Sequence, residues 1–266
     1  GTGLLGINFL NYFYKDFEIT VNYNSKKFFH PNLKYIKVNL NKHDDILNSI
    51  NKIKPDIIVN ACAKTNIDWC SANPKISYAI NVSLAEKLAE ICDNFGIYFV
   101  QISSDHLFSG KVKFKGEKHK KNPLNEYAKQ KSKAEDLVLK KNNNALIIRT
   151  NFFGYSQDKK DNFITKSISL LENNKLVYAF KDYYFTPIYI TNLLEILKKL
   201  MRKKATGIIN VVGNERVSKY DFLLKVSNIF NLDSSQIKPT LISKSKLTAK
   251  RHLELSLSNK LLKKKY

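Results

Sequence analysis

The fold is decided by two runs of sequence, QISSDHLFSG at residues 101–110 and NPLNEYAKQKSKAE at residues 122–135. Tyr127 and Lys131 stand four residues apart among good helix formers, so both side chains project from one face of a predicted helix. Ser104 follows the apolar run IYFVQI at residues 97–102, which is typical of a buried strand. A helix that carries Tyr and Lys and faces this strand end can supply a proton donor.

The three residue types suit acid–base chemistry for a physical reason. A free tyrosine has a pKa near ~10, so something must stabilise its phenolate at neutral pH. An ammonium about 4 Å away contributes roughly 4 kcal/mol at an effective dielectric constant of about 20, or about three pKa units. The hydroxyl of Ser104 can hold the substrate oxygen that exchanges the proton. The spacing Y-x-x-x-K also recurs by chance on lysine-rich helices, so the pair alone does not decide the function.

Length and composition indicate a globular chain with a large core. The sequence has 266 residues, 43% of them hydrophobic, and no apolar run reaches the ~18 residues of a membrane helix. We therefore expect no membrane association and a cytoplasmic location. Cys62, Cys70 and Cys92 lack a C-x-x-C spacing, so we predict reduced thiols and no metal site.

The net charge of +22 raises nucleic acid as a partner, because phosphate attracts basic clusters. Only four of the 45 basic residues are Arg, and the lysines are scattered along the whole chain. This distribution indicates a compositional bias toward Lys, so we expect no nucleic-acid partner. An affinity for DNA that survived physiological salt would contradict that expectation.

The run GTGLLG at residues 1–6 precedes a helical pattern of apolar residues, as expected where a glycine loop opens a helix toward a phosphate. A dinucleotide-binding loop normally follows a buried strand. The sequence given starts at the loop, so the first strand and the first glycine are expected to be missing from it. We accordingly expect residues 1–266 alone to bind a cofactor weakly.

The middle of the chain alternates predicted strands with predicted helices. Strands are expected at residues 18–22, 35–38, 57–60 and 145–149, and helices at 43–53 and 84–95. This rhythm predicts an α/β fold of the Rossmann type, a doubly wound parallel sheet with ligands at the carboxyl ends of its strands. Residues 1–150 are expected to form the NAD(P)-binding domain, which also takes in roughly 176–212. Residues 151–266 are expected to form mainly a smaller substrate-binding lobe.

The C-terminal part has weaker signals. We expect a helix at residues 162–171, a strand at 176–180 and a strand at 208–212. Thr191 is a candidate N-cap of a helix that Gly207 would stop, and Ser218 with Asp221 resembles a capping box.

The loop after the second strand favours one cofactor over another. Residues 22–27 read NYNSKK, with no acid to bind a free ribose 2′-hydroxyl, whereas Ser25 and Lys26 could contact a 2′-phosphate. We therefore expect NADPH rather than NADH, although the lysines could equally be two more surface residues.

Several motifs together resemble a known family. They are PDIIVNACA at residues 55–63, NV at 81–82, SSDHLFSG at 103–110, NEYAKQK at 125–131, IRT at 148–150, and Arg251. In this order they resemble the extended short-chain dehydrogenases/reductases, and within these the dTDP-4-dehydrorhamnose reductase family.

The resemblance implies a catalytic set of Ser104, Tyr127 and Lys131, in which Tyr127 gives a proton to a sugar C4 oxygen while NAD(P)H supplies hydride. The substrate would be a nucleotide-linked deoxy sugar, and a homodimer would be compatible with the family. The remaining expected contacts fall into two sets. The cofactor contacts are Thr2, Gly3, Leu4, Leu5, Gly6, Ser25, Lys26, Asn39, Leu40, Ala61, Cys62, Ala63, Thr65 and Ser103; the substrate contacts are Asp105, His106, Asn151, Phe152, Phe185 and Arg251.

His106 departs from the family pattern, which often has Tyr at this place, and we expect it to pack or to face the substrate lobe. Related 4,6-dehydratases commonly carry Asp-Glu here, so Asp105-His106 argues against dehydration. Two alternatives stay open. A C4 epimerase would use the same three residues and retain its nicotinamide, and a non-catalytic regulatory subunit, such as the methionine adenosyltransferase beta subunit, could keep the set.

Overall fold

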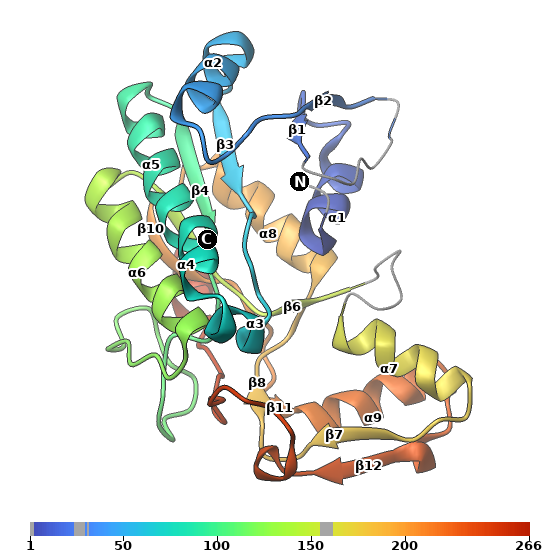
Figure 1. Cartoon of the computed structure of the whole chain (residues 1–266). Coiled ribbons are helices and arrows are strands. Elements are labelled where there is room, and N and C mark those ends of the chain that lie inside the picture. The colour runs from blue at the N-terminus through green and yellow to red at the C-terminus, as the bar shows by residue number, and fades with distance from the viewer. Residues whose placement is uncertain (1–2, 24–29, 31, 155–161) are drawn as a thin grey trace.

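The computed structural model describes residues 3–23, 30, 32–154 and 162–266. Its centre is a four-stranded parallel sheet in the order β10-β5-β4-β3 (Figure 1). The strands are β3 (Ile57–Asn60), β4 (Tyr98–Ile102), β5 (Leu146–Arg149) and β10 (Gly207–Asn210). The predicted α/β fold with a parallel sheet is confirmed.

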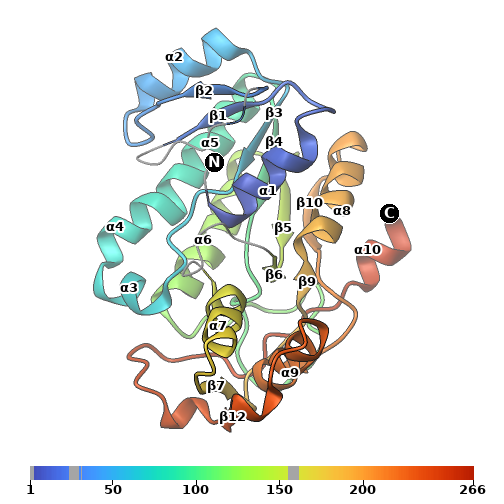
Figure 2. The same ribbon diagram turned by 90° about the vertical axis from the view of Figure 1, so that its right-hand side faces the viewer.

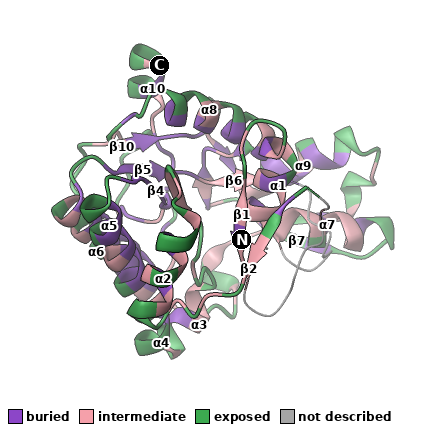
Figure 3. Cartoon of the chain, turned by 90° about the horizontal axis from the view of Figure 1, so that it is seen from above, coloured by how far each residue is buried: buried purple, intermediate pink, exposed green. Residues whose placement is uncertain are grey.

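Helices cover both faces of this sheet. On one face lie α1 (Leu4–Phe13) and α8 (Ile190–Arg202), and on the other α2 (His43–Ile53), α5 (Leu84–Asn94) and α6 (Glu126–Lys141). Neighbouring residues of one strand pack into the hydrophobic cores on opposite faces of the sheet. Ile148 packs with α8, whereas Ile147 packs with α5 and α6. This alternation is the period of two that a strand buried on both faces requires. Figure 3 shows the buried sheet between helices whose outer faces are exposed.

Two predicted strands lie outside the central sheet. β1 (Thr20–Asn22) and β2 (Lys34–Ile36) form a parallel pair of their own, and their core is Leu10, Val21 and Leu33. Their positions match the predicted strands closely. Among the described residues, β1 pairs only with β2 and not with β3.

The segment between β3 and α5 positions one side of the site. It comprises α3 (Ile67–Ala72), α4 (Pro74–Tyr78) and the π-helical turn Ala79–Ser83 that leads into α5. Within this turn Asn81 is buried, and its amide oxygen accepts from the backbone N–H of Lys64 (2.8 Å). The Asn81 amide also donates to the carbonyl of Lys64 (3.0 Å) and to Gln130 of α6 (2.9 Å). Asn81 therefore fixes the loop after β3 against α6.

A second group of elements lies below the sheet in Figures 1 and 2. It contains α7 (Phe163–Glu172), α9 (Lys219–Ile229) and the parallel pair β7 (Val177–Phe180) and β12 (Ile237–Thr240). The antiparallel pair β8 (Tyr184–Phe185) and β11 (Val217–Ser218) joins them. These elements share a separate hydrophobic core. The division of the chain near residue 150 stays a prediction.

Two short strands, β6 (Phe152–Phe153) and β9 (Ile188–Tyr189), pair in parallel and lead toward this lobe. A last helix, α10 (Lys260–Lys265), closes the chain, and short 3-10 turns occupy Ser234–Gln236 and Ile242–Lys244. No helix in the described ranges combines the length and apolarity that crossing a membrane would require.

Two predicted helix boundaries are wrong. Helix α8 begins at Ile190, whose side chain is buried in the core, so Thr191 lies inside the helix and Tyr189 holds the N-cap position. The helix ends at Arg202, and Gly207, with φ of +81°, instead begins β10. The predicted N-cap Ser218 is confirmed: its hydroxyl accepts from the backbone N–H of Asp221 (3.0 Å).

Candidate active site

The carboxyl ends of β3 and β4 meet the amino-terminal half of α6. Asn60 ends β3, Ser103 and Ser104 follow β4, and Asn125 caps α6 by accepting from the backbone N–H of Ala128 (2.9 Å). Because the strands are parallel and in register, the residues after them share one edge of the sheet. The sequence-predicted residues near this edge are thus brought together by the fold.

Lys131 lies on α6 and is buried, with 3% exposure. Its ammonium donates to the carbonyl of Ile102, the last residue of β4, at 2.7 Å. Burial lowers the pKa of Lys131 to about 8, although the carboxylate of Glu135 opposes that shift. This contact ties the helix to the end of the strand.

Tyr127, one turn earlier on α6, is also buried. Burial raises the pKa of its phenol to about 12, the Ser104 side chain acts to lower it, and Asp105 adds to the increase. This direction is opposite to the predicted lowering by Lys131. The physical reason is that burial outweighs any stabilisation of the phenolate, while the Lys131 ammonium is bound to the Ile102 carbonyl. Tyr127 is therefore protonated at neutral pH and can donate a proton.

Ser104 lies within the same cluster. Its hydroxyl donates to the carboxylate of Asp105 (3.2 Å) and accepts from the backbone N–H of His106 (3.2 Å). It is 6% exposed. These contacts orient the Ser104 side chain, as a residue that positions a substrate oxygen requires.

Asp105 and His106 connect the sheet edge with the second lobe. Burial raises the pKa of Asp105 to about 6, although the amide of Asn151 donates to its carboxylate. The Nε2 atom of His106 lies 3.3 Å from the hydroxyl of Tyr183, and its ring meets the ring of Tyr127 edge-on at 5.7 Å. Burial lowers the pKa of His106 to about 3, so the ring is neutral and packs between the lobes.

The glycine loop has a geometry that fits a phosphate. Gly3 is the N-cap of α1 with extended backbone, its first turn contains no acid, and none of the described side chains caps the helix. As far as the structure describes the chain, the amide groups at the start of α1 can therefore bind an anion. Gly6 lies in the first turn and Leu4 packs partly against the core, whereas Leu5 is buried in that core and faces away from such a site. The predicted contacts Thr2, Ser25 and Lys26 lie outside the described residues.

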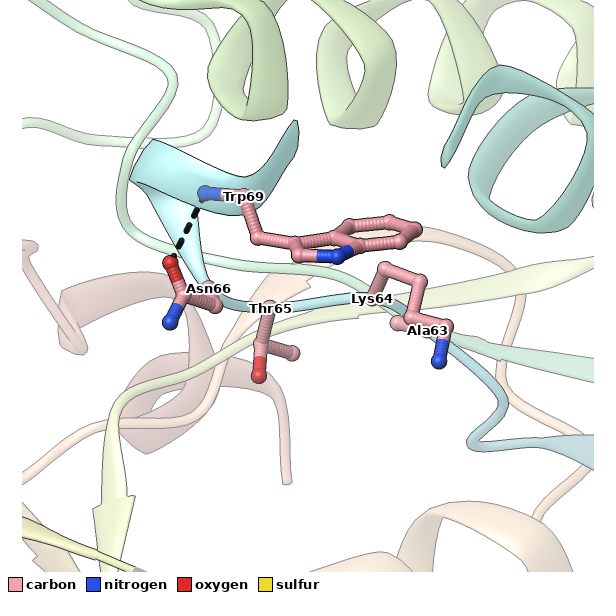
Figure 4. Close-up of a pocket in the computed structure, with 5 residues that line it drawn as sticks. All are labelled: Ala63, Lys64, Thr65, Asn66 and Trp69. Carbon is pink, nitrogen blue, oxygen red and sulfur yellow. Dashed lines mark hydrogen bonds between the residues drawn. The ribbon is translucent and has the colours of Figure 1, made fainter. Parts of the chain in front are cut away.

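The loop after β3 borders a cavity of about 300 Å³. It is lined by the predicted contacts Ala63 and Thr65 and by Lys64, Asn66 and Trp69, a set that includes the only tryptophan of the sequence. Figure 4 shows the Trp69 indole beside the Lys64 side chain, whose ammonium lies 5.2 Å from the ring centre. A flat aromatic surface and a cation at an open cavity suit a ring or an anion of a ligand.

The other predicted cofactor contacts fall into two groups. Ala61 and Cys62 are exposed at the end of β3. Asn39 is also exposed, and its side-chain oxygen accepts from the backbone N–H of Asn41. By contrast Ser103 is buried, and its hydroxyl donates to Glu135 at 2.6 Å. Leu40 packs partly against the core between α2 and α5. Ser103 and Leu40 thus have structural partners.

A smaller cavity of about 60 Å³ lies at the second lobe. Three predicted substrate contacts, Asn151, Phe152 and Phe185, line it, as does Lys219, which sequence reasoning did not identify. The Lys219 ammonium lies 3.8 Å from the centre of the Phe185 ring, and burial lowers its pKa to about 8. Since Lys219 is one lysine among many in the sequence, no local signal distinguishes it.

Arg251 has a different partner from the one expected. Its guanidinium donates to the carboxylate of Asp68 (2.6 Å) and to the carbonyl of Ala249 (2.7 Å), and its side chain is 9% exposed. Its predicted contact with the substrate stays a prediction. In the structure, Arg251 fastens the segment before α10 to α3.

The described part of the chain contains no group of three or more His, Cys, Asp or Glu that could hold a metal ion.

Comparison with known proteins gives a consistent result over the whole chain. The family described as RmlD substrate binding domain matches residues 1–266. A probable low-salt glycan biosynthesis reductase of Haloferax volcanii is 26% identical over 211 residues, which are 78% of this chain and 70% of that protein. The methionine adenosyltransferase 2 subunit beta of Xenopus laevis is also 26% identical, over 71% of this chain and 59% of its own length. The chain thus spans under two thirds of that second relative.

Two solved structures share the fold. A hypothetical dTDP-4-dehydrorhamnose reductase from Sulfolobus tokodaii superposes with a TM-score of 0.89 at 29% identity, over 100% of this chain and 92% of that one. A dTDP-4-dehydrorhamnose reductase from Bacillus anthracis in complex with NADP gives a TM-score of 0.85 at 21% identity, over 98% and 89% of the two chains.

Proposed function

The chain belongs to the RmlD substrate binding domain family, and on that premise we propose that it is an NADPH-dependent oxidoreductase that reduces the 4-keto group of a nucleotide-linked deoxy sugar. The observation that carries the proposal is the convergence of Ser104, Tyr127 and Lys131 at the carboxyl end of β4. The names of the relatives from Haloferax volcanii and Sulfolobus tokodaii support the same class of reaction.

In this proposal each residue has a defined task. When bound, NADPH supplies the hydride to the sugar C4 carbon. Tyr127 is protonated at neutral pH and donates its proton to the C4 oxygen, because a phenol is a stronger acid than the alcohol that forms. Ser104 hydrogen-bonds the same oxygen and orients it. Lys131, fixed by the carbonyl of Ile102, stabilises the phenolate that Tyr127 leaves behind.

In this proposal the cofactor and the substrate bind in separate regions of the site. The amides at the start of α1 and the cavity beside Trp69 would bind NADPH, and the cavity bordered by Asn151 and Phe152 would bind part of the sugar nucleotide. The name of the Bacillus anthracis structure supports NADP over NAD. A homodimer and a cytoplasmic location stay predictions.

The test is an assay of NADPH and NADH oxidation on a panel of nucleotide 4-keto sugars. Tyr127→Phe removes the proton donor, so we expect a loss of roughly 10²- to 10⁴-fold in kcat. Tyr78→Phe, which changes a tyrosine that is 41% exposed on α4, is the matched control and should keep full activity. Full activity of Tyr127→Phe would overturn the mechanism. A nicotinamide absorbance that copurifies with the protein, without net NADPH oxidation, would favour the C4 epimerase.

A regulatory subunit is the second candidate, because a relative of similar identity is named a methionine adenosyltransferase subunit. Recovery of a partner enzyme by pull-down, together with no NADPH oxidation on any 4-keto sugar nucleotide, would favour this candidate. Oxidation that depends on Tyr127 would exclude it as the sole function.

A further inference from the structure

Helix α6 carries a buried carboxylate one turn after Lys131. Glu135 is 1% exposed, and its spacing of four residues from Lys131 makes the two side chains neighbours on one face of the helix. Both bind consecutive residues at the end of β4. The Lys131 ammonium donates to the carbonyl of Ile102 (2.7 Å), and the hydroxyl of Ser103 donates to Glu135 (2.6 Å). Carboxylates are almost never fully buried unless they are paired, so the partners of Glu135 matter.

Three groups hold the Glu135 carboxylate in place. Arg149 of β5, itself 1% exposed, donates from Nε to Oε1 (2.9 Å) and from Nη2 to Oε2 (2.7 Å). Ser103 is the second group, and the third is the ammonium of Lys121, which lies 3.6 Å from Oε2. These partners come from β5, from the end of β4 and from the loop before α6. The carboxylate is therefore fixed between two strands and the helix that carries Lys131.

The Lys131 ammonium lies where a positive charge is costly. Its one hydrogen-bond acceptor among the described residues, the carbonyl of Ile102, is neutral and also accepts from the side-chain amide of Gln101 (2.9 Å). Burial lowers the pKa of Lys131, and the two titratable groups that oppose this shift are Glu135 and the thiol of Cys62. Burial raises the pKa of the Cys62 thiol, so that thiol is neutral at pH 7. Glu135 is thus the group whose negative charge stabilises the ammonium.

The spacing sets the size of this effect. Side chains four residues apart on a helix have Cβ atoms about 5–6 Å apart, and an opposite charge at about 4–6 Å moves a pKa by roughly 1–3 units. Tyr127, one turn before Lys131, is neutral in the resting site, because burial raises its pKa to about 12. Lys131 therefore depends on Glu135 for its charge until the phenolate of Tyr127 forms.

We propose that Glu135 is a positioning residue of the reductase site, and that its buried carboxylate keeps Lys131 charged at neutral pH while it fastens α6 to the end of β4. This inference rests on the proposed function, in which the charge of Lys131 acts on the phenolate of Tyr127. Glu135 acts through Lys131 and touches neither substrate nor cofactor.

The first experiment compares pH–rate profiles of the full chain, with the sugar nucleotide of the panel above that the wild type reduces fastest. The wild-type rate should fall above about pH 8, where Lys131 loses its proton. Glu135→Gln should move this alkaline limb to lower pH by at least about one unit. Asp136→Asn removes an exposed carboxylate from the next residue of the same helix, and should leave the limb unchanged.

A double variant separates the electrostatic role from a structural one. Glu135→Gln alone leaves Arg149 buried without its carboxylate and destabilises the fold. Glu135→Gln combined with Arg149→Met removes both charges, and should recover much of the stability that the single variant loses. A merely structural role predicts that the alkaline limb recovers with the stability. The proposal predicts that the limb stays at lower pH, because no carboxylate lies beside Lys131.

A measurement without turnover keeps this inference separate from the reductase function. The free energy of unfolding in urea is compared between the wild type and Lys131→Met from pH 6 to pH 10. The folded pKa of Lys131, about 8, lies below its ordinary value of 10.5, so between these values only the unfolded chain keeps the proton. The wild type should therefore gain stability relative to Lys131→Met as the pH rises above about 8. In the background of the double variant this gain should begin at least about one pH unit lower.

Two results would overturn the role of Glu135. They are an alkaline limb and an onset of the stability gain that both stay at the wild-type pH when Glu135 is replaced, and an equal shift of the limb in Asp136→Asn. A protein whose stability gain moves as expected, but which oxidises no NADPH on any sugar nucleotide of the panel, would refute only the proposed reductase function.

Discussion

Asp68 joins α3 to the C-terminal segment, and its replacement by Asn should destabilise the protein measurably. One carboxylate oxygen accepts from the backbone N–H of Thr248 (3.1 Å), from the Thr248 hydroxyl (2.9 Å) and from the backbone N–H of Ala249 (2.9 Å). The other accepts from the guanidinium of Arg251 (2.6 Å). In Asp68→Asn the amide oxygen can keep the first three bonds, whereas the amide nitrogen faces Arg251. Asp68→Asn therefore removes the ion pair with Arg251 and keeps the acceptor for the other three hydrogen bonds.

The magnitude follows from the pKa of Asp68. Burial acts to raise it, but the hydrogen bonds from Arg251, Ala249 and Thr248 lower it from 3.8 to about 2. A difference of about 1.8 units at 1.36 kcal/mol each corresponds to about 2.4 kcal/mol. The Asp68 side chain is 32% exposed, so solvent screening reduces the expected contribution to about 1–2 kcal/mol.

The pH dependence has a definite sign. Because the folded pKa lies below the unfolded value, this stabilisation is fully present above pH 3.8 and is lost as the pH falls through about 2. At pH 3 roughly half of it should remain. The difference in stability between the wild type and Asp68→Asn should therefore shrink between neutral pH and pH 3.

Urea unfolding provides the measurement, followed by circular dichroism and by the fluorescence of Trp69, the neighbour of Asp68 and the only tryptophan. Asp136→Asn is the control, since Asp136 pairs with Lys121 at 2.6 Å but is 62% exposed, and it should cost less than about 0.5 kcal/mol. The reasoning fails if Asp68→Asn unfolds within about 0.5 kcal/mol of the wild type, or if the difference does not depend on pH.

Three other predictions follow from the structure. Burial lowers the pKa of Lys131 to about 8, so the reduction rate should fall above about pH 8 as the ammonium is lost; a pH–rate profile that stays flat to about pH 10 contradicts this. Glu135→Gln leaves Arg149, which is 1% exposed, without its paired carboxylate at 2.7 Å, and should cost about 3–5 kcal/mol in urea unfolding; a cost below about 1 kcal/mol contradicts it. In Gly213→Ala the new Cβ would lie 2.1 Å from a main-chain oxygen and should lower Tm by several degrees, whereas Gly116→Ala, with nothing within 4 Å, should not; equal Tm values for the two variants would refute the argument.

The sheet and helix α6 could be predicted because their signals are local. Runs such as IIVN at residues 57–60 and YFVQI at 98–102 carry enough apolar residues to be buried on both faces, and the structure has strands there. The predicted helix at 43–53 has the bounds of α2. Spacing by four residues likewise places Tyr127 and Lys131 on one helix. The periodicity of apolar residues and the positions of strand ends are sufficient to predict all of these features.

The second lobe could not be predicted in the same way, because its site depends on contacts between distant residues. Lys219 is distinguished by the rings around it, and these come from two separate segments, one at Phe163 and the other at Tyr183 and Phe185. The pairing of Arg251 with Asp68 joins residues 183 positions apart. The pattern of a single sequence does not show contacts between residues that are far apart in it. Lys219 therefore could not be distinguished from the other lysines by the sequence alone.

The pKa of Tyr127 shows a further limit of spacing arguments. A spacing of four residues places two side chains on one face of a helix, but it does not determine what the end of a long side chain contacts. Lys131 extends to the carbonyl of Ile102, and burial then raises the phenol pKa to about 12 instead of lowering it. A raised pKa makes Tyr127 a weaker acid than free tyrosine, so in the proposed reaction the phenolate that forms needs stabilisation. If the charge of Lys131 supplies that stabilisation, as we propose, it matters for the transition state more than for the resting pKa of Tyr127.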